Sequence, residues 1–444
     1  MFRAARPAAR TARRCRAAAK ARAGAAADGC APAARRPAAG RRSRSPNALH
    51  DAGKSLSTPV VSPRVDQPSN LRFLTHTRHE GAPPRPGNTS TPVLCEAFPM
   101  RYVIIGAGAV GGTVGGRLAG SGHEVVLVAR GAHHASLRDD GLRLRVPEGE
   151  LTYRLPVVDG PTPLGELRED DVLVLAVKTQ DTEGALDAWG PAPVAGGGTA
   201  AERLPLLCAQ NGVEGQRIAL RRFRRVYGVC VWLPSTFVEP GVVSAAGSPL
   251  TGILHLGVYP HGTDETARRV AADLEKSRFE APVVPDLARW QYAKLLSNLA
   301  NAVEAVAGPV ESEEALALVG RVRAEGRAVL DAAGIAYASV EEQRALRGDK
   351  VTLQPLEGAP RGGGSSWQSL TRGTGTIEAD HLNGEIALLG RLHGVPTPLN
   401  ELLQRLANTC ARERRRPGAM PVGELVRLAD EAETAVGKER RLTR

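Results

Sequence analysis

The sequence is poor in aromatic residues and has no long apolar run. Phe, Trp and Tyr make up 4% of the 444 residues, so a folded core has to be built mainly from Leu, Val and Ala. No uninterrupted apolar run approaches the about 20 residues that a membrane-spanning helix needs, which argues against a membrane protein. A secretory signal peptide is excluded as well, because no apolar segment follows the basic start of the chain.

Cysteine is also scarce, and its spacing points to no known chemistry. The six cysteines include no pair with CxxC spacing, and no cluster of histidines accompanies them. We therefore predict no metal site and no disulfide framework, and expect reduced thiols in a cytoplasmic protein. Cys208 and Cys230 lie inside apolar runs and are predicted to be core residues. The six are Cys15, Cys30, Cys95, Cys208, Cys230 and Cys410.

Acidic residues are nearly missing from the first hundred positions. Residues 1–99 hold 18 Lys and Arg against five Asp and Glu, whereas the rest of the chain holds 40 against 42. The formal charge of +11 therefore belongs to a basic extension, and the near-neutral remainder argues against nucleic acid as a partner. The extension has too little apolar surface to offset chain entropy, so we predict disorder for it.

The strand that should open the folded part begins directly after Met100. We favour the interpretation that Met100 is the real initiator and that residues 1–99 are an over-extended reading frame. A translated disordered tail and an Arg-rich organelle-targeting segment are the alternatives. At the other end, residues 412–444 are charged and are predicted to be a tail that frays or forms a surface helix.

A glycine-rich loop follows the first predicted strand. The β-branched run 102–105 leads into Gly106-Ala107-Gly108-Ala109-Val110-Gly111, and a helix is predicted next. In a loop of this kind Gly106 permits a tight turn, Gly108 lets a pyrophosphate approach the backbone, and Gly111 lets helix and strand pack closely. The pyrophosphate then lies at the helix N-terminus. We predict a dinucleotide-binding, doubly wound α/β domain of the Rossmann type over residues 100–284.

The residue after the second strand indicates which dinucleotide is bound. That strand, 124–129, is followed by Arg130 and not by an acid. An acid at this place binds the ribose 2′-hydroxyl and repels a 2′-phosphate, whereas an arginine offers the phosphate a planar, charged fork. We therefore predict NADP, as NADPH in the reducing direction. An ordinary surface arginine is the alternative.

Two further predicted strands end in polar residues. Lys178 follows the strand 171–177, and Asn211 follows the strand 204–209. In an open α/β sheet, ligands bind beyond the carboxyl ends of the strands. We expect Lys178 and Asn211 to face the cofactor or the substrate, although each alone could equally have a structural role.

From about residue 285 the apolar residues recur at helical spacing, which predicts an all-helical second domain over 285–411. One of its helices carries Lys294, Asn298 and Asn301 on a single face. Such a polar stripe is either exposed or lines a cleft, and the spacing does not decide between the two. Glu378 lies on an otherwise apolar stripe. A carboxylate in such a place needs an ion-pair or hydrogen-bond partner, or has a function.

Taken together, these motifs resemble those of the ketopantoate reductase family from about Met100 to about Asn408. The resemblance implies a Rossmann-type domain, a helical domain and a substrate cleft between them. It also implies NADPH-dependent reduction of 2-dehydropantoate to pantoate, a step toward pantothenate and coenzyme A. The matching segments are GAGAVGG, Arg130, VKTQ, QNGV, WxxxKLLxN, and SSW followed by IEADHLNG.

The resemblance also implies a role for each matching side chain. Lys294 corresponds to the proton donor, Asn298 to a substrate-binding asparagine, and Ser366 to the contact for the substrate carboxylate. Glu378 corresponds to an active-site glutamate, which we expect to hold Lys294 or the nicotinamide ribose. The cofactor side is implied for Lys178 and Asn211, and Asn211 is also expected to reach the substrate.

One position departs from the family pattern. The family has a further asparagine eight residues after the lysine, where this chain has Ala302. Asn301 precedes it and is predicted to face the cleft and bind substrate in its place. The small 2-oxo acid substrate is thus either 2-dehydropantoate or another branched 2-oxo acid.

Two further questions concern the kind of protein and its assembly. A non-catalytic NADP-sensing protein is the alternative of another class. The joint retention of Lys294, Asn298, Ser366 and Glu378 argues against it. Family members often form homodimers, but the sequence does not decide the oligomeric state of this chain.

Overall fold

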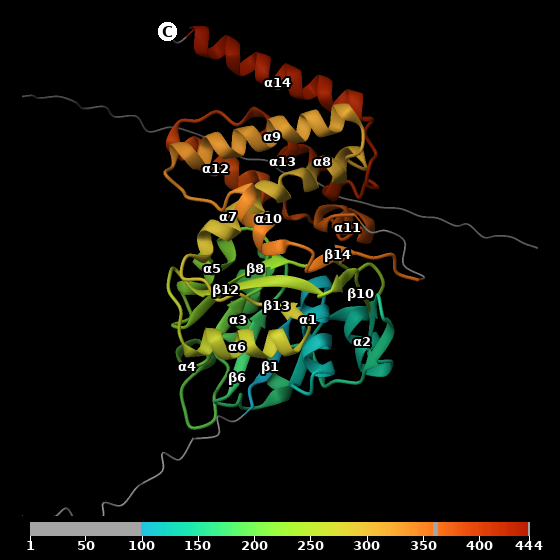
Figure 1. Cartoon of the computed structure of the whole chain (residues 1–444), viewed down its shortest axis with the longest axis vertical. Helices are drawn as coiled ribbons and strands as arrows, with labels where there is room; N and C mark the ends of the chain where they lie inside the picture. Colours follow the sequence, from blue (N-terminus) through green and yellow to red (C-terminus); the bar gives the residue numbers. More distant parts are fainter. Residues whose placement is uncertain (1–98, 358–362, 443–444) are drawn as a thin grey trace, which may run out of the picture. The chain divides into compact units, whose positions relative to one another are not determined.

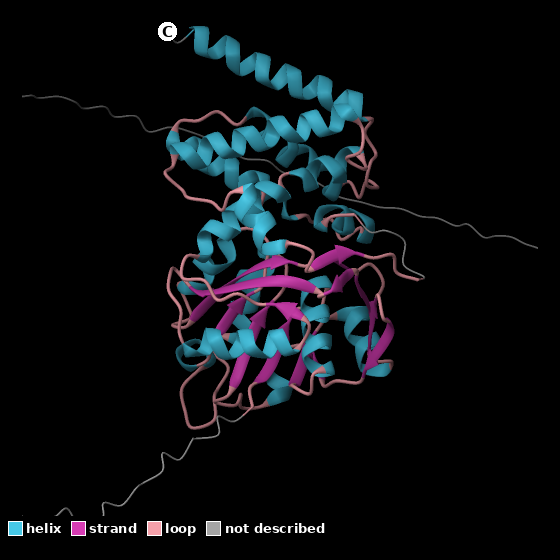
Figure 2. Cartoon of the chain, viewed as in Figure 1, coloured by secondary structure: helices cyan, strands magenta, loops and turns pink. Residues whose placement is uncertain are grey.

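The computed structural model describes residues 99–357 and 363–442 (Figure 1). The basic extension predicted over 1–99 therefore lies outside the described residues, apart from Pro99, as do positions 358–362 of the glycine-rich segment before Ser366. The described part begins with a mixed α/β region and continues into helices (Figure 2). This confirms the predicted fold class.

Eight strands form the main sheet, in the order β13-β12-β8-β7-β6-β1-β2-β5. Parallel pairing joins the neighbouring strands β8, β7, β6, β1, β2 and β5. Strand β12, in contrast, runs antiparallel to β8 and parallel to β13. Every residue of β6 is buried, as expected for a parallel strand that is covered on both faces. The strands are β1 Arg101–Ile105, β2 Glu124–Val128, β5 Val157–Val158, β6 Asp171–Leu175, β7 Leu206–Cys208, β8 Val226–Trp232, β12 Gly252–Val258 and β13 Phe279–Glu280.

Alternate residues of β1 belong to two different cores, because successive side chains of a strand point to opposite faces. Tyr102 and Ile104 pack with helices α1 (Ala109–Gly120) and α6 (Glu265–Lys276). Val103 and Ile105 pack with α3 (Thr182–Trp189), α4 (Ala200–Arg203) and α5 (Glu214–Leu220). Helices thus cover both faces of the sheet, which is the doubly wound arrangement (Figure 1).

A second sheet packs against α1 and was not predicted. It has the order β4-β3-β10-β9. Glycines on α1 make this close packing possible: a Cβ at Gly112 would lie 2.8 Å from Val243 Cγ2, and one at Gly116 would lie 3.0 Å from Leu144 Cδ2. The strands are β3 Leu142–Val146, β4 Gly149–Tyr153, β9 Ser235–Thr236 and β10 Val242–Ala245, and α2 (Gly131–Asp139) precedes β3.

The C-terminal part has its own apolar core, built from helices. One short strand, β14 (Val351–Leu353), interrupts the helices and pairs with β11 (Gly247–Pro249). The polar-stripe helix is divided at Leu299 into α7 and α8. The helices are α7 Leu287–Asn298, α8 Ala300–Ala307, α9 Glu313–Ala332, α10 Val340–Arg347, α11 Ser365–Arg372, α12 Asn383–His393, α13 Pro398–Arg412 and α14 Val422–Leu442.

Helix α14 lies within the segment that was predicted to be a charged tail. Leu425 and Ala429 of this helix are buried in the C-terminal core. Arg321 of α9 pairs with Asp430 at 2.8 Å and with Glu433 at 2.6 Å. The helix is therefore packed on one face and charged on the other.

Several observations bear on the compositional predictions. Cys208 and Cys230 are buried, which confirms them as core residues, and burial raises the pKa of each thiol to about 12.

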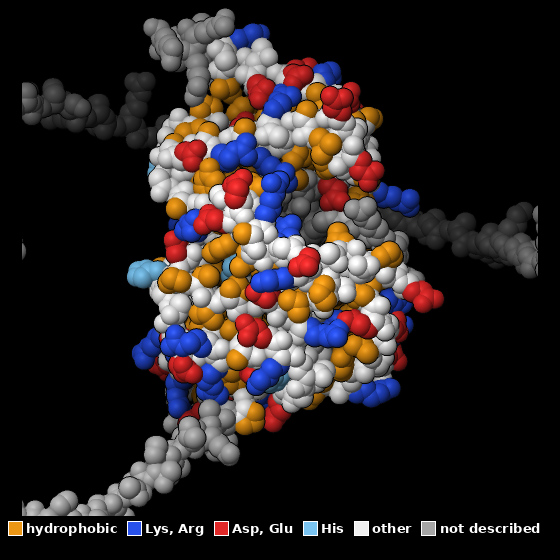
Figure 3. Space-filling model, in the orientation of Figure 1, with side chains coloured by type: hydrophobic (Ala, Val, Ile, Leu, Met, Phe, Trp, Pro, Cys, Tyr) orange, Lys and Arg blue, Asp and Glu red, His pale blue; other side chains and the backbone are white. Residues whose placement is uncertain are grey.

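Across residues 99–357 and 363–442, no helix has the length and apolar character required to cross a bilayer. On the face seen in Figure 3, acidic and basic side chains are interspersed.

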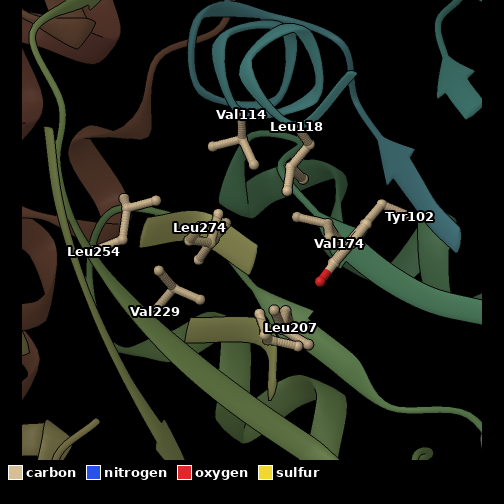
Figure 4. A pocket seen from close by; sticks show the side chains of 10 residues that line it. Tyr102, Val114, Leu118, Val174, Leu207, Val229, Leu254 and Leu274 are labelled. Carbon is tan, nitrogen blue, oxygen red and sulfur yellow. The ribbon is translucent and has the colours of Figure 1, made fainter. Parts of the chain in front are cut away.

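A small gap in the core lies between the main sheet and helices α1 and α6 (Figure 4). Its lining is apolar apart from the hydroxyl of Tyr102, which donates a hydrogen bond to Asp273 at 2.8 Å. Val114, Leu118 and Leu274 are among the side chains that surround it. None of the predicted site residues lines this gap, so we assign it to core packing.

Candidate active site

The predicted polar residues lie beyond the ends of four neighbouring parallel strands. These strands are adjacent in the order β7-β6-β1-β2, so their carboxyl ends lie along one edge of the sheet. The glycine loop follows β1 and Arg130 closely follows β2. Lys178 follows β6 and Asn211 follows β7. The structure therefore places all four predicted features at the same edge.

The three glycines of the loop differ in what surrounds them. Gly106 has a φ of +102°, which L side chains rarely adopt, and a Cβ there would lie 2.8 Å from Val177 N. At Gly111 a Cβ would lie 2.1 Å from the carbonyl oxygen of Gly106. Gly108 is different, because a Cβ there would meet only Phe237 Cδ1, at 3.8 Å. The backbone at Gly108 is thus open to an approaching group.

Helix α1 starts next to that open position. Gly108 is its N-cap, no side chain caps the N-terminus, and the first turn contains no acidic residue. The free N–H groups and the helix dipole at such an end favour an anion. The residues of the loop therefore fit a dinucleotide pyrophosphate.

His133 fixes the position of the glycine loop, a role that the sequence analysis missed. Its Nδ1 accepts a hydrogen bond from Gly241 N at 3.0 Å, so its Nε2 carries the proton that is donated to Ala107 O at 2.8 Å. Burial lowers the pKa of His133. The neutral ring therefore connects the loop to the turn before β10.

Arg130 is exposed at the start of α2, where it is the N-cap residue with an extended backbone. No carboxylate of residues 99–357 or 363–438 lies within ion-pair distance of its guanidinium. The guanidinium of Arg130 therefore has no acidic partner in these ranges. It belongs to the residue that closely follows β2, the strand beside β1 and its glycine loop.

Buried Glu378 forms an ion pair with the half-buried Lys178. Lys178 Nζ donates to Glu378 Oε2 at 2.5 Å, and the backbone N and Oγ1 of Thr179 contact Oε1 at 3.2 and 3.3 Å. Burial alone would raise the pKa of Glu378, but the charge and hydrogen bond of Lys178 and the bonds from Thr179 outweigh it and lower the pKa. This pair joins the end of β6 to the 3₁₀ turn η3 (Glu378–His381).

Glu378 is not paired with Lys294, one of the two partners that we expected for it. Within the described ranges its hydrogen bonds go to Lys178 and Thr179, and its predicted contact with the nicotinamide ribose stays a prediction. The physical reason is that η3 packs against the turn η2 (Thr179–Asp181) and brings the carboxylate to the end of β6. Thr179 was not among the predicted site residues.

Asn298 and Asn211 meet, although 87 positions separate them in sequence. Asn298 is buried on α7, and its Nδ2 donates to Asn211 Oδ1 at 3.3 Å. Lys294 lies one helical turn earlier on α7 and is half-buried. Helix α7 packs against β8 and β12, so the polar stripe faces the sheet domain and is not an exposed stripe.

Lys294 lies against an aromatic ring. Its Nζ is 4.0 Å from the centroid of the Trp232 ring, close enough for a cation–π interaction. Burial and, to a smaller extent, the charge of Arg347 lower the pKa of Lys294 to about 8, against the raising effect of Cys230. Lys294 is thus an ammonium group that loses its proton at a lower pH than an ordinary lysine.

Asn301 and Ser366 lie at the junction of α8 and α11. Asn301 Nδ2 donates to Ser365 Oγ at 3.3 Å, and Ser366 is the next residue of α11. Ser366 is buried, and its hydroxyl has no hydrogen-bond partner among the residues that the structure describes. Ala302, in contrast, is packed in the apolar core. Asn301 and not position 302 therefore faces the segment that carries Ser366.

Helix α11 is also tied to the glycine loop through Phe237. Gln368 accepts from Phe237 N at 3.1 Å, and Arg372 donates to Phe237 O at 2.8 Å. The Phe237 ring packs on His133, with 4.4 Å between centroids. Phe237 therefore contacts both α11, which bears Ser366, and His133, which is hydrogen-bonded to the glycine loop. No local sequence signal would have revealed this connection.

In the part of the chain that the structure describes, no three His, Cys, Asp or Glu residues are grouped so that they could hold a metal ion.

Comparison with known proteins identifies the family. The model of the ketopantoate reductase PanE/ApbA family matches residues 102–261, and the model of its C-terminal part matches residues 286–411. A 2-dehydropantoate 2-reductase of Pyrococcus horikoshii is 27% identical over 321 residues, which cover 69% of this chain and 96% of that protein.

Solved structures agree with these matches. A PanE/ApbA family ketopantoate reductase from Ralstonia eutropha JMP134 superposes with a TM-score of 0.57 at 28% identity, covering 71% of this chain and all of that one. A D-mandelate dehydrogenase solved with NADH and anilino(oxo)acetate has a TM-score of 0.59 at 23% identity, covering 71% and 100% of the two chains, and supports the fold alone.

The sheet, its glycine loop and the polar groups beyond the strand ends define an oxidoreductase built on a Rossmann-type domain and a helical part. The two family matches make the assignment specific. The chain belongs to the ketopantoate reductase family.

Proposed function

We propose that this enzyme reduces 2-dehydropantoate to pantoate with NADPH, and that Lys294 donates the proton. The observation that carries the proposal is the meeting of the α7 stripe with the strand ends, where Asn298 contacts Asn211 one helical turn from Lys294. The substrate is suggested by relatives that are named 2-dehydropantoate 2-reductases, such as that of Pyrococcus horikoshii.

The residues of the sheet edge would hold the cofactor. The open backbone at Gly108 and the uncapped start of α1 suit the pyrophosphate. The guanidinium of Arg130, which has no ion-pair partner among the described side chains, suits the 2′-phosphate. Lys178, Glu378 and Asn211 would then face the nicotinamide end. When bound, the reduced nicotinamide supplies the hydride.

Lys294 would act on the carbonyl oxygen of the substrate. Negative charge develops on this oxygen during reduction, and a nearby ammonium both stabilises the charge and supplies the proton. A pKa of about 8 suits this task, because a donor works best when its pKa is near the working pH. Asn298 and Asn211 would orient the substrate oxygens, and Ser366 would contact its carboxylate.

Replacing Arg130 with Asp should reverse the cofactor preference. The aspartate would repel the 2′-phosphate and accept a hydrogen bond from a ribose hydroxyl. Because a charge-assisted hydrogen bond contributes about 1.5–3 kcal/mol, kcat/KM for NADPH should fall about 10- to 100-fold or more, while that for NADH holds or rises. Steady-state kinetics with both cofactors measure this, with Arg138→Asp on the exposed end of α2 as the control. An unchanged NADPH preference would remove Arg130 from the site.

A second candidate keeps the reaction and changes the substrate to another branched 2-oxo acid. It is favoured by the burial of Ala302, which leaves the site without the later asparagine, and by the bond between Asn301 and Ser365. Turnover on 2-dehydropantoate compared with turnover on 2-oxoisovalerate separates the two candidates. A protein that reduces neither with NADPH or NADH would instead fit the NADP-sensing alternative.

A further inference from the structure

Trp232 carries a second cation besides Lys294. The guanidinium carbon of Arg347, in the last turn of α10, is 4.7 Å from the centroid of the same ring. Trp232 is the last residue of β8, which continues past the residue paired with the end of β7. The ring therefore lies on the site side of the sheet, in contact with the proposed proton donor and with an arginine for which neither the family pattern nor the mechanism provides a role.

Neither cation has an acidic partner among the side chains of residues 99–357 and 363–438. No Asp or Glu in these ranges forms an ion pair with Lys294 or Arg347, and the side chain of Arg347 makes no hydrogen bond within them. Its neighbour Lys350, three residues later, is in contrast paired with Glu280 at 2.5 Å. Two like charges that contact one aromatic ring repel each other, and a bound anion would relieve this repulsion.

A second candidate anion site, the N-terminus of α11 beside Ser366, is occupied by the carboxylate of Glu304. The N-terminus of α11 would attract a carboxylate, but Gly364 N, at the N-cap of this helix, donates to Glu304 Oε2 at 2.7 Å. Glu304 thus places a negative charge close to Ser366. A hydroxyl alone can donate one hydrogen bond to a substrate carboxylate, so its charge has to be balanced by a cation elsewhere.

We propose that Arg347 binds the carboxylate of the 2-oxo acid substrate and thereby sets a preference for anionic over neutral carbonyl compounds. The carboxylate and the carbonyl of a 2-oxo acid are on neighbouring carbon atoms, so this molecule presents two groups that suit the two cations at the Trp232 ring. Lys294 then faces the carbonyl oxygen, and Arg347 offers the carboxylate its planar fork. This inference rests on the proposed function and deepens it.

The test compares an acid with a neutral analogue. The acid is 2-dehydropantoate, and its lactone keeps the 2-oxo carbon but lacks the carboxylate. In Arg347→Gln, kcat/KM for the acid should fall about 10- to 100-fold, as expected for a lost charge-assisted hydrogen bond, whereas kcat/KM for the lactone should change less than about threefold. Arg344→Gln removes an equal charge from the same helical turn and should leave both substrates nearly unaffected.

Two results would overturn the inference. An equal loss for acid and lactone, with the same shift in both pH profiles, would mean that Arg347 acts only on the pKa of Lys294. Unchanged kinetics in Arg347→Gln would mean that it is an ordinary surface arginine.

Failure of the proposed function is recognised separately, because the wild-type protein would then not reduce 2-dehydropantoate. Calorimetric titration of oxamate into the NADPH-loaded protein would decide the inference in that case. Binding that is at least about tenfold weaker in Arg347→Gln than in wild type and Arg344→Gln supports it. Equal binding by the three proteins, or no binding at all, contradicts it.

Discussion

Lys294→Ala is expected to lower kcat by about two orders of magnitude or more, because general acid catalysis contributes roughly 10²- to 10⁴-fold. The side chain is half-buried beside Trp232 and one turn from Asn298, so no solvent-borne acid is positioned to replace it. NADPH should still bind, since the glycine loop and Arg130 belong to different elements. Stopped-flow turnover and NADPH fluorescence titration measure the two effects separately.

The pH dependence of the wild type provides the internal control for Lys294. The donor must be protonated, and burial lowers its pKa to about 8. The kcat for reduction should therefore fall as the pH rises through about 8, and the residual activity of Lys294→Ala should lack that step. Near-normal turnover in the variant, or the same alkaline step in both proteins, would show that another group supplies the proton.

Gly111→Ala is expected to lose NADPH binding and to lower the melting temperature. The added Cβ would lie 2.1 Å from Gly106 O and 2.8 Å from Ile104 Cγ2, so α1 must move away from β1. Overpacking of this kind costs about 1–3 kcal/mol, and the displaced loop no longer matches the pyrophosphate. Thermal unfolding with and without NADPH measures both consequences.

Two other glycines serve as matched controls. Gly108→Ala meets only Phe237 Cδ1 at 3.8 Å, so it should weaken NADPH binding and leave the melting temperature of the free protein nearly unchanged. Gly184 is on α3 with nothing within 4 Å of the added Cβ, and its alanine variant should be as stable as wild type or up to about 1 kcal/mol more stable. A Gly111→Ala protein that binds NADPH normally would contradict the role given to this loop.

The sequence predicted well those features that depend on a short run of consecutive residues. The β-branched run of β1, the glycine loop and the start of α1 follow one another within 101–120, and each has a strong local preference. The same holds for the polar residues after β6 and β7, since the position of a strand end is visible in the chain itself. Helical periodicity likewise placed Lys294 and Asn298 on one face of α7.

The features that the sequence missed depend on distant parts of the chain. Lys178 and Glu378 are 200 positions apart, and nothing local indicated that the carboxylate would pair with Lys178 and not with Lys294. The same is true of Trp232 and Arg347, which meet only because α10 packs near the end of β8. Periodicity across Leu299 predicted Asn301 on the face of Asn298, yet the two asparagines bond to different elements, Ser365 of α11 and Asn211 after β7.

The central claim is tested most directly by one assay on the wild-type protein. Purified enzyme is mixed with NADPH and 2-dehydropantoate, the loss of NADPH absorbance is followed, and the product is identified by mass spectrometry. The account predicts one pantoate formed for each NADPH oxidised, with a higher kcat/KM than for 2-oxoisovalerate and than with NADH. Absence of pantoate, or faster reduction of 2-oxoisovalerate under the same conditions, would contradict it.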